Sequence, residues 1–209
     1  MTSRRSFIKK TTAGTAAVTL GGIVFPKNSY ANILGANDHI NCAVIGVRSR
    51  AKAHVKAISA DTNAKILYNC DVDDVIIEEH NAWCQKNIGY VPKVEKDFRK
   101  ILEDKDVDAV FIATPEHWHA PMAIMAMQAG KHVYVEKPCS HNPHENDLLV
   151  AAQKKYGKKV QMGNQQRSAL TSQSAIKDIR AGVIGEVYKG EAYYSNNRGS
   201  IGIGNKIDV

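Results

Sequence analysis

Cysteine is scarce in this chain of 209 residues, and none of its four cysteines stands in a C-x-x-C pair. That spacing is typical of zinc knuckles and of redox motifs, so the sequence favours neither kind of site. Cys42 and Cys70 lie in apolar runs, where a thiol usually serves as a small core side chain. The other two cysteines are Cys84 and Cys139, and the sequence leaves a disulfide between any of the four open.

Acidic residues are absent from the first 31 positions, which carry five basic residues. The formal net charge of the whole chain is +7, so the remainder holds 23 basic and 21 acidic residues. A surplus that small does not indicate a polyanion-binding surface. We therefore expect no nucleic-acid partner.

No long hydrophobic run is present near the N-terminus. The apolar stretch TTAGTAAVTLGGIVF is short for a membrane span, which needs about 20 apolar residues. It follows a basic stretch and precedes a small-x-small ending at residues 29–31, an order that is typical of a signal peptide. The pair Arg4-Arg5 with Phe7-Ile8-Lys9 resembles a twin-arginine signal. We expect a signal over residues 1–31, the twin-arginine export machinery as a partner, and a periplasmic location; an arbitrary basic N-terminus or an uncleaved anchor is the alternative.

Internal repeats and low-complexity segments are also absent, and strand and helix patterns alternate strictly from about residue 39. Nearly continuous apolar strands that alternate with helices predict a parallel sheet covered on both faces. The predicted fold is α/β, a Rossmann-type doubly wound sheet over residues 39–165, followed at 166–209 by the truncated start of a second α+β domain. In that second segment, residues 186–197 have the alternating pattern of a strand. Ligands of such sheets bind at the carboxyl ends of the strands.

The first strand ends in the sequence VIGVRSRAKAH (44–54), at the place where a phosphate loop lies in dinucleotide-binding folds. Of the three glycines of the G-x-G-x-x-G fingerprint, only Gly46 is present, because Arg48 and Ala51 occupy the other two positions. An arginine side chain that swings outward could pair with a phosphate. An ordinary strand–turn–helix is about equally consistent with this stretch alone. The loop residues expected at a cofactor are Gly46, Val47, Arg48 and Ser49.

Asp71 follows the second strand, 25 residues after Gly46. A carboxylate at this place accepts hydrogen bonds from a ribose diol and repels the extra phosphate of NADP. Alternatively, Asp71 or Asp73 only caps the next helix. The two acids allow both functions, with Asp71 on the ribose and Asp73 as the cap.

A loop with two histidines, ATPEHWHAP (113–121), follows a later strand. Two histidines suggest zinc, but an H-x-H pair with no fixed third ligand is weak evidence for a metal. His141 and His144 are further ligand candidates. We favour an aromatic and imidazole wall beside a cofactor and expect no metal site. The residues expected to line the cofactor here are Thr114, Pro115, Glu116, Trp118 and His119.

The next strand ends in VYVEKPCS (133–140). Near a nicotinamide ring, Lys137 could hydrogen-bond a substrate hydroxyl and stabilise developing negative charge. The alternative is a surface lysine before a turn. Pro138 fixes the backbone and can adopt the cis isomer. Asn164, after the sixth strand, could bind the carboxamide or ribose of a cofactor, or could only stabilise a turn.

These stretches in this order resemble the Gfo/Idh/MocA family of NAD(P)-dependent oxidoreductases over about residues 39–209, and AGKHVYVEKP is the most specific of them. The resemblance implies a Rossmann domain, a second domain that holds a sugar, inositol or polyol substrate, and hydride transfer. It implies that Lys137 belongs to the catalytic site and that Glu136, Lys137, Pro138 and Asn164 join the cofactor-lining residues. NAD is expected over NADP because of Asp71. A carbohydrate substrate and a homo-oligomer of the full-length protein are expected as well.

The loop GVRS is also similar to an exported NAD-dependent glycosidase branch, in which an arginine follows the first glycine by two. That branch lacks the Lys-Pro of EKP, so the sequence does not assign this chain to it. Export of a folded protein suggests a cofactor that is loaded before export, stays bound, and is recycled in each catalytic cycle. The other hypotheses are an inactive nucleotide-binding protein and a metal-dependent hydrolase. In this family an acid and a histidine of the second domain complete proton transfer, and they would lie beyond residue 209.

Overall fold

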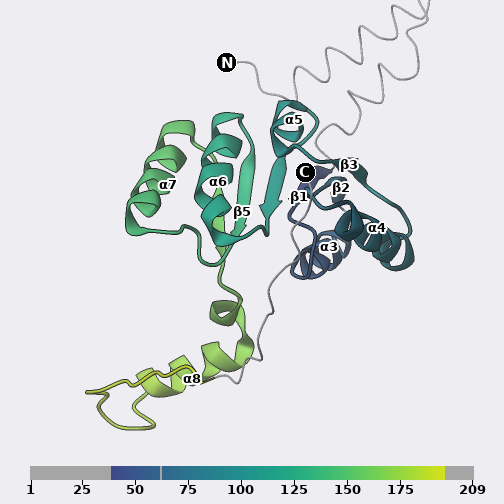
Figure 1. Ribbon diagram of the computed structural model, residues 1–209. Coiled ribbons are helices and arrows are strands. Elements are labelled where there is room, and N and C mark those ends of the chain that lie inside the picture. Colours follow the sequence, from purple (N-terminus) through teal and green to yellow (C-terminus); the bar gives the residue numbers. More distant parts are fainter. Residues whose placement is uncertain (1–38, 62, 196–209) are drawn as a thin grey trace, which may run out of the picture. The chain divides into compact units, whose positions relative to one another are not determined.

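The computed structural model describes residues 39–61 and 63–195 (Figure 1). The predicted signal at 1–31 and the last residues, 196–209, lie outside the described residues. The chain divides into two compact units, one that ends at Gly163 and one that begins at Asn164. The first unit holds the sheet and is the larger one.

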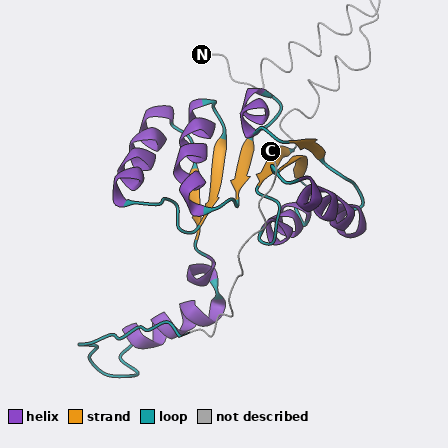
Figure 2. Cartoon of the chain, in the orientation of Figure 1, coloured by secondary structure: helices purple, strands orange, loops and turns teal. Residues whose placement is uncertain are grey.

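The first unit is built on one parallel sheet of six strands in the order β3-β2-β1-β4-β5-β6 (Figure 2). The strands are β1 (Ile40–Ile45), β2 (Ala64–Cys70), β3 (Lys93–Glu95), β4 (Ala109–Ile112), β5 (His132–Glu136) and β6 (Val160–Gly163). This strand order is that of the dinucleotide-binding α/β fold, and it confirms the predicted doubly wound sheet.

Helices connect the strands of the first unit. They are α3 (Ala51–Ser59), α4 (Asp74–Ile88), α5 (Phe98–Glu103), the short 3₁₀ helix η2 (Glu116–Trp118), α6 (His119–Gln128) and α7 (Pro143–Tyr156). In Figure 1, α6 and α7 lie next to each other beside β5. In the part of the chain that the structure describes, no helix has both the length and the apolar character needed to cross a membrane.

The alternating side chains of β1 show that both faces of the sheet are covered. Ala43 and Ile45 belong to a core that also includes residues of α5, α6 and α7. Cys42 and Val44 belong to a second core, formed with α3 and α4. Successive residues of a strand point to opposite faces, so a strand between two layers of helices must be apolar throughout. This explains the continuous apolar run that the sequence shows at β1.

Local capping signals set the ends of the longer helices. Asp73 caps α4 by accepting from the backbone N–H groups of Val75 and Ile76, as predicted, and α4 is followed by Gly89 at φ 80°. Asn142 caps α7 and precedes Pro143, and the helix is followed by Gly157 at φ 64°. These signals are local in sequence, because each residue lies within a few positions of the helix end that it sets.

The cysteines are all free thiols in the structure. Three are buried in the two cores, and Cys139 is partly exposed. Burial raises the pKa of Cys42 and of Cys70 to about 12, so both thiols are neutral at ordinary pH. Their role is packing, as the apolar runs around them predict.

The second unit begins with the 3₁₀ helix η3 (Gln165–Ser168) and α8 (Leu170–Arg180). The strand expected over 186–197 is wrong for residues 186–195, which have no regular secondary structure. A strand needs a neighbour to take its backbone hydrogen bonds, and the described residues of this unit contain no second strand. An alternating pattern alone does not supply that neighbour.

Candidate functional site

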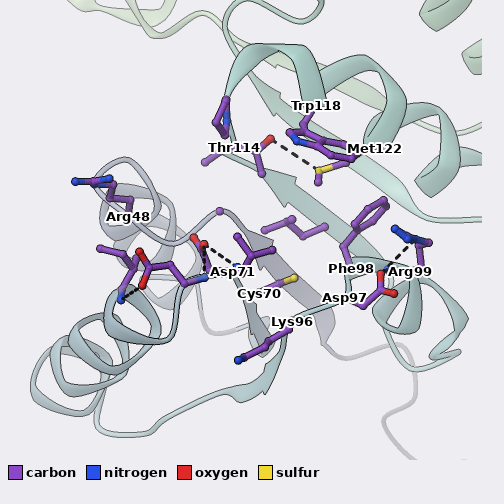
Figure 3. Close-up of a pocket in the computed structure, with 17 residues that line it drawn as sticks. Arg48, Cys70, Asp71, Lys96, Asp97, Phe98, Arg99, Thr114, Trp118 and Met122 are labelled. Atoms are coloured by element: carbon purple, nitrogen blue, oxygen red, sulfur yellow. Dashed lines mark hydrogen bonds and ion pairs between the residues drawn. The ribbon is translucent and has the colours of Figure 1, made fainter. Parts of the chain in front are cut away.

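A pocket of about 500 Å³ opens at the carboxyl ends of β1, β2, β3 and β4 (Figure 3). In the sheet, β2 lies on one side of β1 and β4 lies on the other, so the strand order reverses at β1. Sheets of this kind bind ligands at such a switch point. The lining combines an apolar floor with a charged rim. Its residues are Ile45, Gly46, Arg48, Cys70, Asp71, Val72, Asp73, Ile76, Lys96, Asp97, Phe98, Arg99, Ala113, Thr114, Pro115, Trp118 and Met122.

Gly46 makes the tight turn at the end of β1. Its φ is +84°, and a Cβ at this position would lie 2.7 Å from the carbonyl carbon of Ala113 and 2.7 Å from the nitrogen of Thr114. Only glycine tolerates both the left-handed backbone and this approach to the end of β4. The helix that follows starts at Arg50 without a side-chain cap, so the first N–H groups of α3 have no side-chain acceptor.

Asp71 connects the end of β2 to this turn. Its Oδ2 accepts from the N–H of Val47 at 2.9 Å, while its Oδ1 accepts from Val72 at 2.8 Å and from Asp73 at 3.3 Å. A carboxylate oxygen has two lone pairs, so Oδ2 can accept a further donor from the pocket. Val47 itself is buried and contributes its backbone to the site. The two acids therefore divide their work, since Asp73 is the helix cap.

An apolar slot lies across the pocket from Asp71 (Figure 3). The rings of Phe98 and Trp118 meet edge to face, with centroids 6.4 Å apart and an angle of 67°. Thr114 Oγ1 lies 3.8 Å from the sulfur of Met122 and closes one side of the slot. The two rings pack against each other, so the exposed part of the Trp118 ring is the aromatic surface that faces the pocket.

Cations stand at the rim, and most of them are already paired. Lys96 Nζ lies 2.7 Å from a carboxylate oxygen of Asp74, and Arg99 Nε lies 3.3 Å from Asp97 Oδ1. Arg48 is exposed and makes no ion pair with a described residue. Figure 3 shows its side chain pointing away from Asp71, in the outward orientation that the sequence allowed.

His119 lies inside the first unit. It is 2 % exposed and does not line the pocket. Its Nδ1 lies 2.5 Å from the carbonyl oxygen of Pro138, and its Nε2 lies 2.8 Å from that of Thr114. Trp118 lines the pocket, whereas His119 turns inward and joins the loops after β4 and β5; the imidazole wall beside a cofactor stays a prediction.

The remaining predicted residues lie outside this pocket. Ser49, Glu116, Lys137 and Pro138 are exposed, and the Lys137–Pro138 peptide bond is cis. Glu136 is buried and faces α3 instead of the pocket. The residues expected at the cofactor but absent from the pocket lining are Val47, Ser49, Glu116, His119, Glu136, Lys137, Pro138 and Asn164.

Asn164 belongs to the second unit, where it precedes η3. Its predicted role at a cofactor stays a prediction. Within residues 39–61 and 63–195, no three His, Cys, Asp or Glu side chains gather in a way that could hold a metal ion.

Two groups of residues at the sheet edge were not predicted from the sequence. The first is Asp97 and Phe98, which follow β3. Their signal was their position directly after a short strand, since the other strand ends also carry site residues. The second is Arg50 and His54, which contact Glu136. Their spacing of four residues places them on one face of α3, and a histidine on an apolar helix face was the available signal.

The fold and the site define a Rossmann-type dinucleotide-binding protein. Residues 40–164 match the model of the Gfo/Idh/MocA oxidoreductase family, which has an NAD-binding Rossmann fold. The chain belongs to this family, as the motifs at 113–121 and 129–138 predicted.

Curated relatives include glycosyl hydrolase family 109 protein 2 of Shewanella sp. (strain ANA-3), 30% identical over 207 residues that cover 91% of this chain and 45% of that protein. The family 109 protein of Shewanella pealeana is 29% identical and is covered over 41% of its length. The chain thus spans less than half the length of these relatives.

Two inositol dehydrogenases are similar in structure. The myo-inositol 2-dehydrogenase of Lactobacillus plantarum superposes with a TM-score of 0.63 at 25% identity, over 71% of this chain and 43% of that one. The scyllo-inositol dehydrogenase of Lactobacillus casei gives a TM-score of 0.62 at 26% identity, over 72% and 44%.

Proposed function

We propose that this chain binds NAD at the carboxyl edge of its sheet, and that the protein is an NAD-dependent oxidoreductase acting on a sugar, polyol or glycoside. The observation that supports this most is the junction of Gly46, Val47 and Asp71, which opens directly into an aromatic slot. Family membership and two dehydrogenases of similar structure support the reaction class.

The residues present fit the adenosine half of a dinucleotide. The missing Cβ of Gly46 and the uncapped start of α3 suit a pyrophosphate, which binds backbone N–H groups at a helix start. The free lone pair of Asp71 Oδ2 suits a ribose hydroxyl, and the partly exposed ring of Trp118, beside Met122 in the pocket lining, suits the adenine ring. When bound, the nicotinamide supplies the hydride acceptor or donor of the reaction.

The charges of the rim favour NAD over NADP. A 2′-phosphate on the ribose would face the carboxylate of Asp71. Lys96 and Arg99, the other cations of the rim, each lie beside an aspartate, Asp74 and Asp97, which lowers the positive charge at that side of the pocket. Arg48 is the exposed cation of the turn, and we assign it to the pyrophosphate.

Lys137 is assigned to the substrate. It follows β5, two strands from β1 at the same edge of the sheet, and its side chain is exposed. A lysine ammonium at this place can donate a hydrogen bond to a substrate hydroxyl and stabilise negative charge that develops on its oxygen. The carbohydrate class of the substrate is proposed from the inositol dehydrogenases and from the resemblance in sequence.

A glycosidase is the second proposed function. The relatives carry the name of a glycosyl hydrolase family, and Arg48 stands where that branch has its arginine. In this version, oxidation of the sugar would allow elimination of the aglycone, water would add to the unsaturated sugar, and return of the hydride would leave no net oxidation. Release of an aglycone without net formation of NADH would favour this function, whereas accumulation of NADH with an oxidised sugar would favour the dehydrogenase.

The proposal also includes export by the twin-arginine route, a periplasmic location, a homo-oligomeric full-length protein, and a cofactor that stays bound during recycling. The basic, apolar and small-residue segments of residues 1–31 support the export step. Nucleotide released from denatured, exported protein would support retention. An empty site that fills readily from solution would contradict it.

Replacement of Asp71 by Asn tests NAD binding directly. We expect Asp71→Asn to weaken NAD binding by about tenfold, because a charged acceptor of a ribose hydroxyl is lost. NADP should lose less affinity, because the repulsion of its phosphate disappears with the charge. Titration calorimetry with both nucleotides measures the ratio.

Asp73→Asn is the matched control, because it removes a charge two residues away from a side chain that caps α4. We expect it to leave NAD affinity within about twofold, since an asparagine also caps helices well. Absence of NAD binding by the unmodified chain, or equal losses in the two variants, would contradict the assignment.

A further inference from the structure

The end of β5 carries a buried charge cluster, formed by Glu136, Arg50 and His54. Glu136 Oε1 accepts a hydrogen bond from Arg50 Nε at 2.8 Å, and His54 Nε2 lies 3.0 Å from the same oxygen. The contact with His54 is a close approach of an imidazole nitrogen to a carboxylate oxygen and not a well-formed hydrogen bond. The side chains of Glu136 and His54 are 8% and 7% exposed, whereas that of Arg50 is 42% exposed, so Arg50 covers a buried carboxylate from the surface.

The space for this carboxylate is built by a third element. Gly163 pairs with Glu136 across β5 and β6. A Cβ on Gly163 would lie 3.0 Å from Glu136 Oε1 and 2.7 Å from the hydroxyl of Tyr134. The ring of His54 also meets the ring of Tyr134 edge to face at 5.0 Å. Residues of α3, β5 and β6 thus enclose the side chain of Glu136.

The charges of the cluster are matched. The hydrogen bond to Glu136 raises the pKa of Arg50 further, so the guanidinium stays charged. Burial lowers the pKa of His54, and the attraction of Glu136 opposes this only in part, so the imidazole is neutral at pH 7. A buried carboxylate without a cationic partner is strongly unfavourable. Arg50 is therefore a cationic partner that helps Glu136 to lie inside.

We infer that Glu136 is a positioning residue, whose ion pair with Arg50 ties the end of β5 to the start of α3 and so holds Lys137 in place. Glu136 and Lys137 are adjacent, so the anchored side chain fixes the backbone from which the lysine projects. Arg50 stands at the N-cap of α3, directly after the turn at Gly46. One ion pair thus joins the turn assigned to the pyrophosphate and the lysine assigned to the substrate. This inference rests on the proposed function, and it replaces the role of Glu136 as a cofactor contact.

The test follows Lys137 without any cofactor. The rate at which its amine is methylated by formaldehyde and borohydride is measured by mass spectrometry in the whole chain. We expect Glu136→Gln and Arg50→Met each to change this rate by about threefold or more, because a loosened strand end alters the exposure of the amine. Arg50→Lys should restore most of the original rate, since it keeps the charge. Glu103→Gln is the control, because it removes an exposed carboxylate at the end of α5.

A second measurement separates positioning from cofactor contact. Under the inference, the NAD affinity of Glu136→Gln stays within about threefold of that of the original chain. The double variant Glu136→Gln with Arg50→Met changes the methylation rate of Lys137 no more than either single variant does. An unchanged rate at Lys137, or a loss of NAD affinity above about tenfold with an unchanged rate, would overturn it. Arg50 is partly exposed at a helix start, so Arg50→Met keeps the test usable if Glu136→Gln does not fold. If the original chain does not bind NAD, the proposed function is overturned. The methylation rates then still decide whether the ion pair of Glu136 and Arg50 positions Lys137.

Discussion

The two sides of the sheet edge hold their carboxylates in different ways. On the side of β2, Asp71 is half-buried and accepts hydrogen bonds from three backbone N–H groups. On the side of β5, Glu136 is buried and pairs with a side-chain cation. The backbone donors around Asp71 leave its carboxylate able to accept a hydrogen bond from a ligand. The ion pair of Glu136 instead holds the end of β5 to the start of α3. The difference separates a binding group from an anchoring group of the same chemistry.

The largest expected effect is a loss of stability at Gly46, where the turn after β1 packs closely against the backbone after β4. Gly46→Ala should lower the free energy of unfolding by about 4 kcal/mol. Two costs add up, because alanine is strained in the left-handed backbone conformation and its Cβ clashes with backbone atoms. The clash involves Ala113 and Thr114, 2.7 Å from the added carbon. Urea unfolding measures the change.

Gly89→Ala is the matched control. Gly89 also has a positive φ, of +80°, but nothing lies within 4 Å of its added Cβ. It should therefore cost about 1 kcal/mol, the strain alone. Equal losses in the two variants would show that the approach of β1 to β4 is not the reason for a glycine at position 46.

A fall in pH should lower the free energy of unfolding more through His80, in α4, than through His54, in α3. His80, in α4, is 1% exposed, and neither ring nitrogen hydrogen-bonds a described residue. Burial lowers its pKa from 6.5 to about 4, followed by a smaller effect of Lys52. Because the unfolded chain then binds more protons than the folded one, stability is full above pH 6.5 and falls as the pH drops towards about 4, by about 3 kcal/mol.

Unfolding in urea between pH 7 and pH 4 measures this loss. His80→Phe should flatten the profile in that window, while His117→Phe, at an exposed position, should leave it unchanged. His54→Phe should flatten it less than His80→Phe, because Glu136 stabilises the charged form of His54. A His80→Phe profile as steep as the original one would remove His80 as the cause.

The smallest effect concerns two arginines that are two residues apart. Arg50 is held by Glu136, whereas Arg48 is exposed and makes no ion pair with a described residue. Arg48→Gly should speed the release of NAD by about threefold, since an exposed charge pair contributes little. Stopped-flow fluorescence measures the rate, with Arg48→Lys as the variant that keeps the charge. Unchanged or slower release from Arg48→Gly would mean that Arg48 does not grip the phosphates.

Much of the fold could be predicted because its signals are local. The strands appear as apolar runs, and the helix ends are marked by Asp73, Asn142, Pro143 and Gly157. The strand expected at 186–197 was wrong over its described part, because pairing depends on a partner elsewhere in the chain. Six of the predicted cofactor residues that follow β1, β2 and β4 meet in one pocket, since parallel strands end at the same edge; they are Gly46, Arg48, Asp71, Thr114, Pro115 and Trp118.

The sequence by itself determined the parallel sheet, the glycine turn at its edge and the position of Asp71, because periodicity and turn chemistry are local properties. Only the tertiary structure decided the directions of the side chains at that edge. It turned His119 towards two backbone carbonyls and Glu136 towards Arg50, and it brought Phe98 to face Trp118. Each direction depends on which distant groups can satisfy a buried polar atom or fill an apolar space, and a one-dimensional pattern does not contain those neighbours.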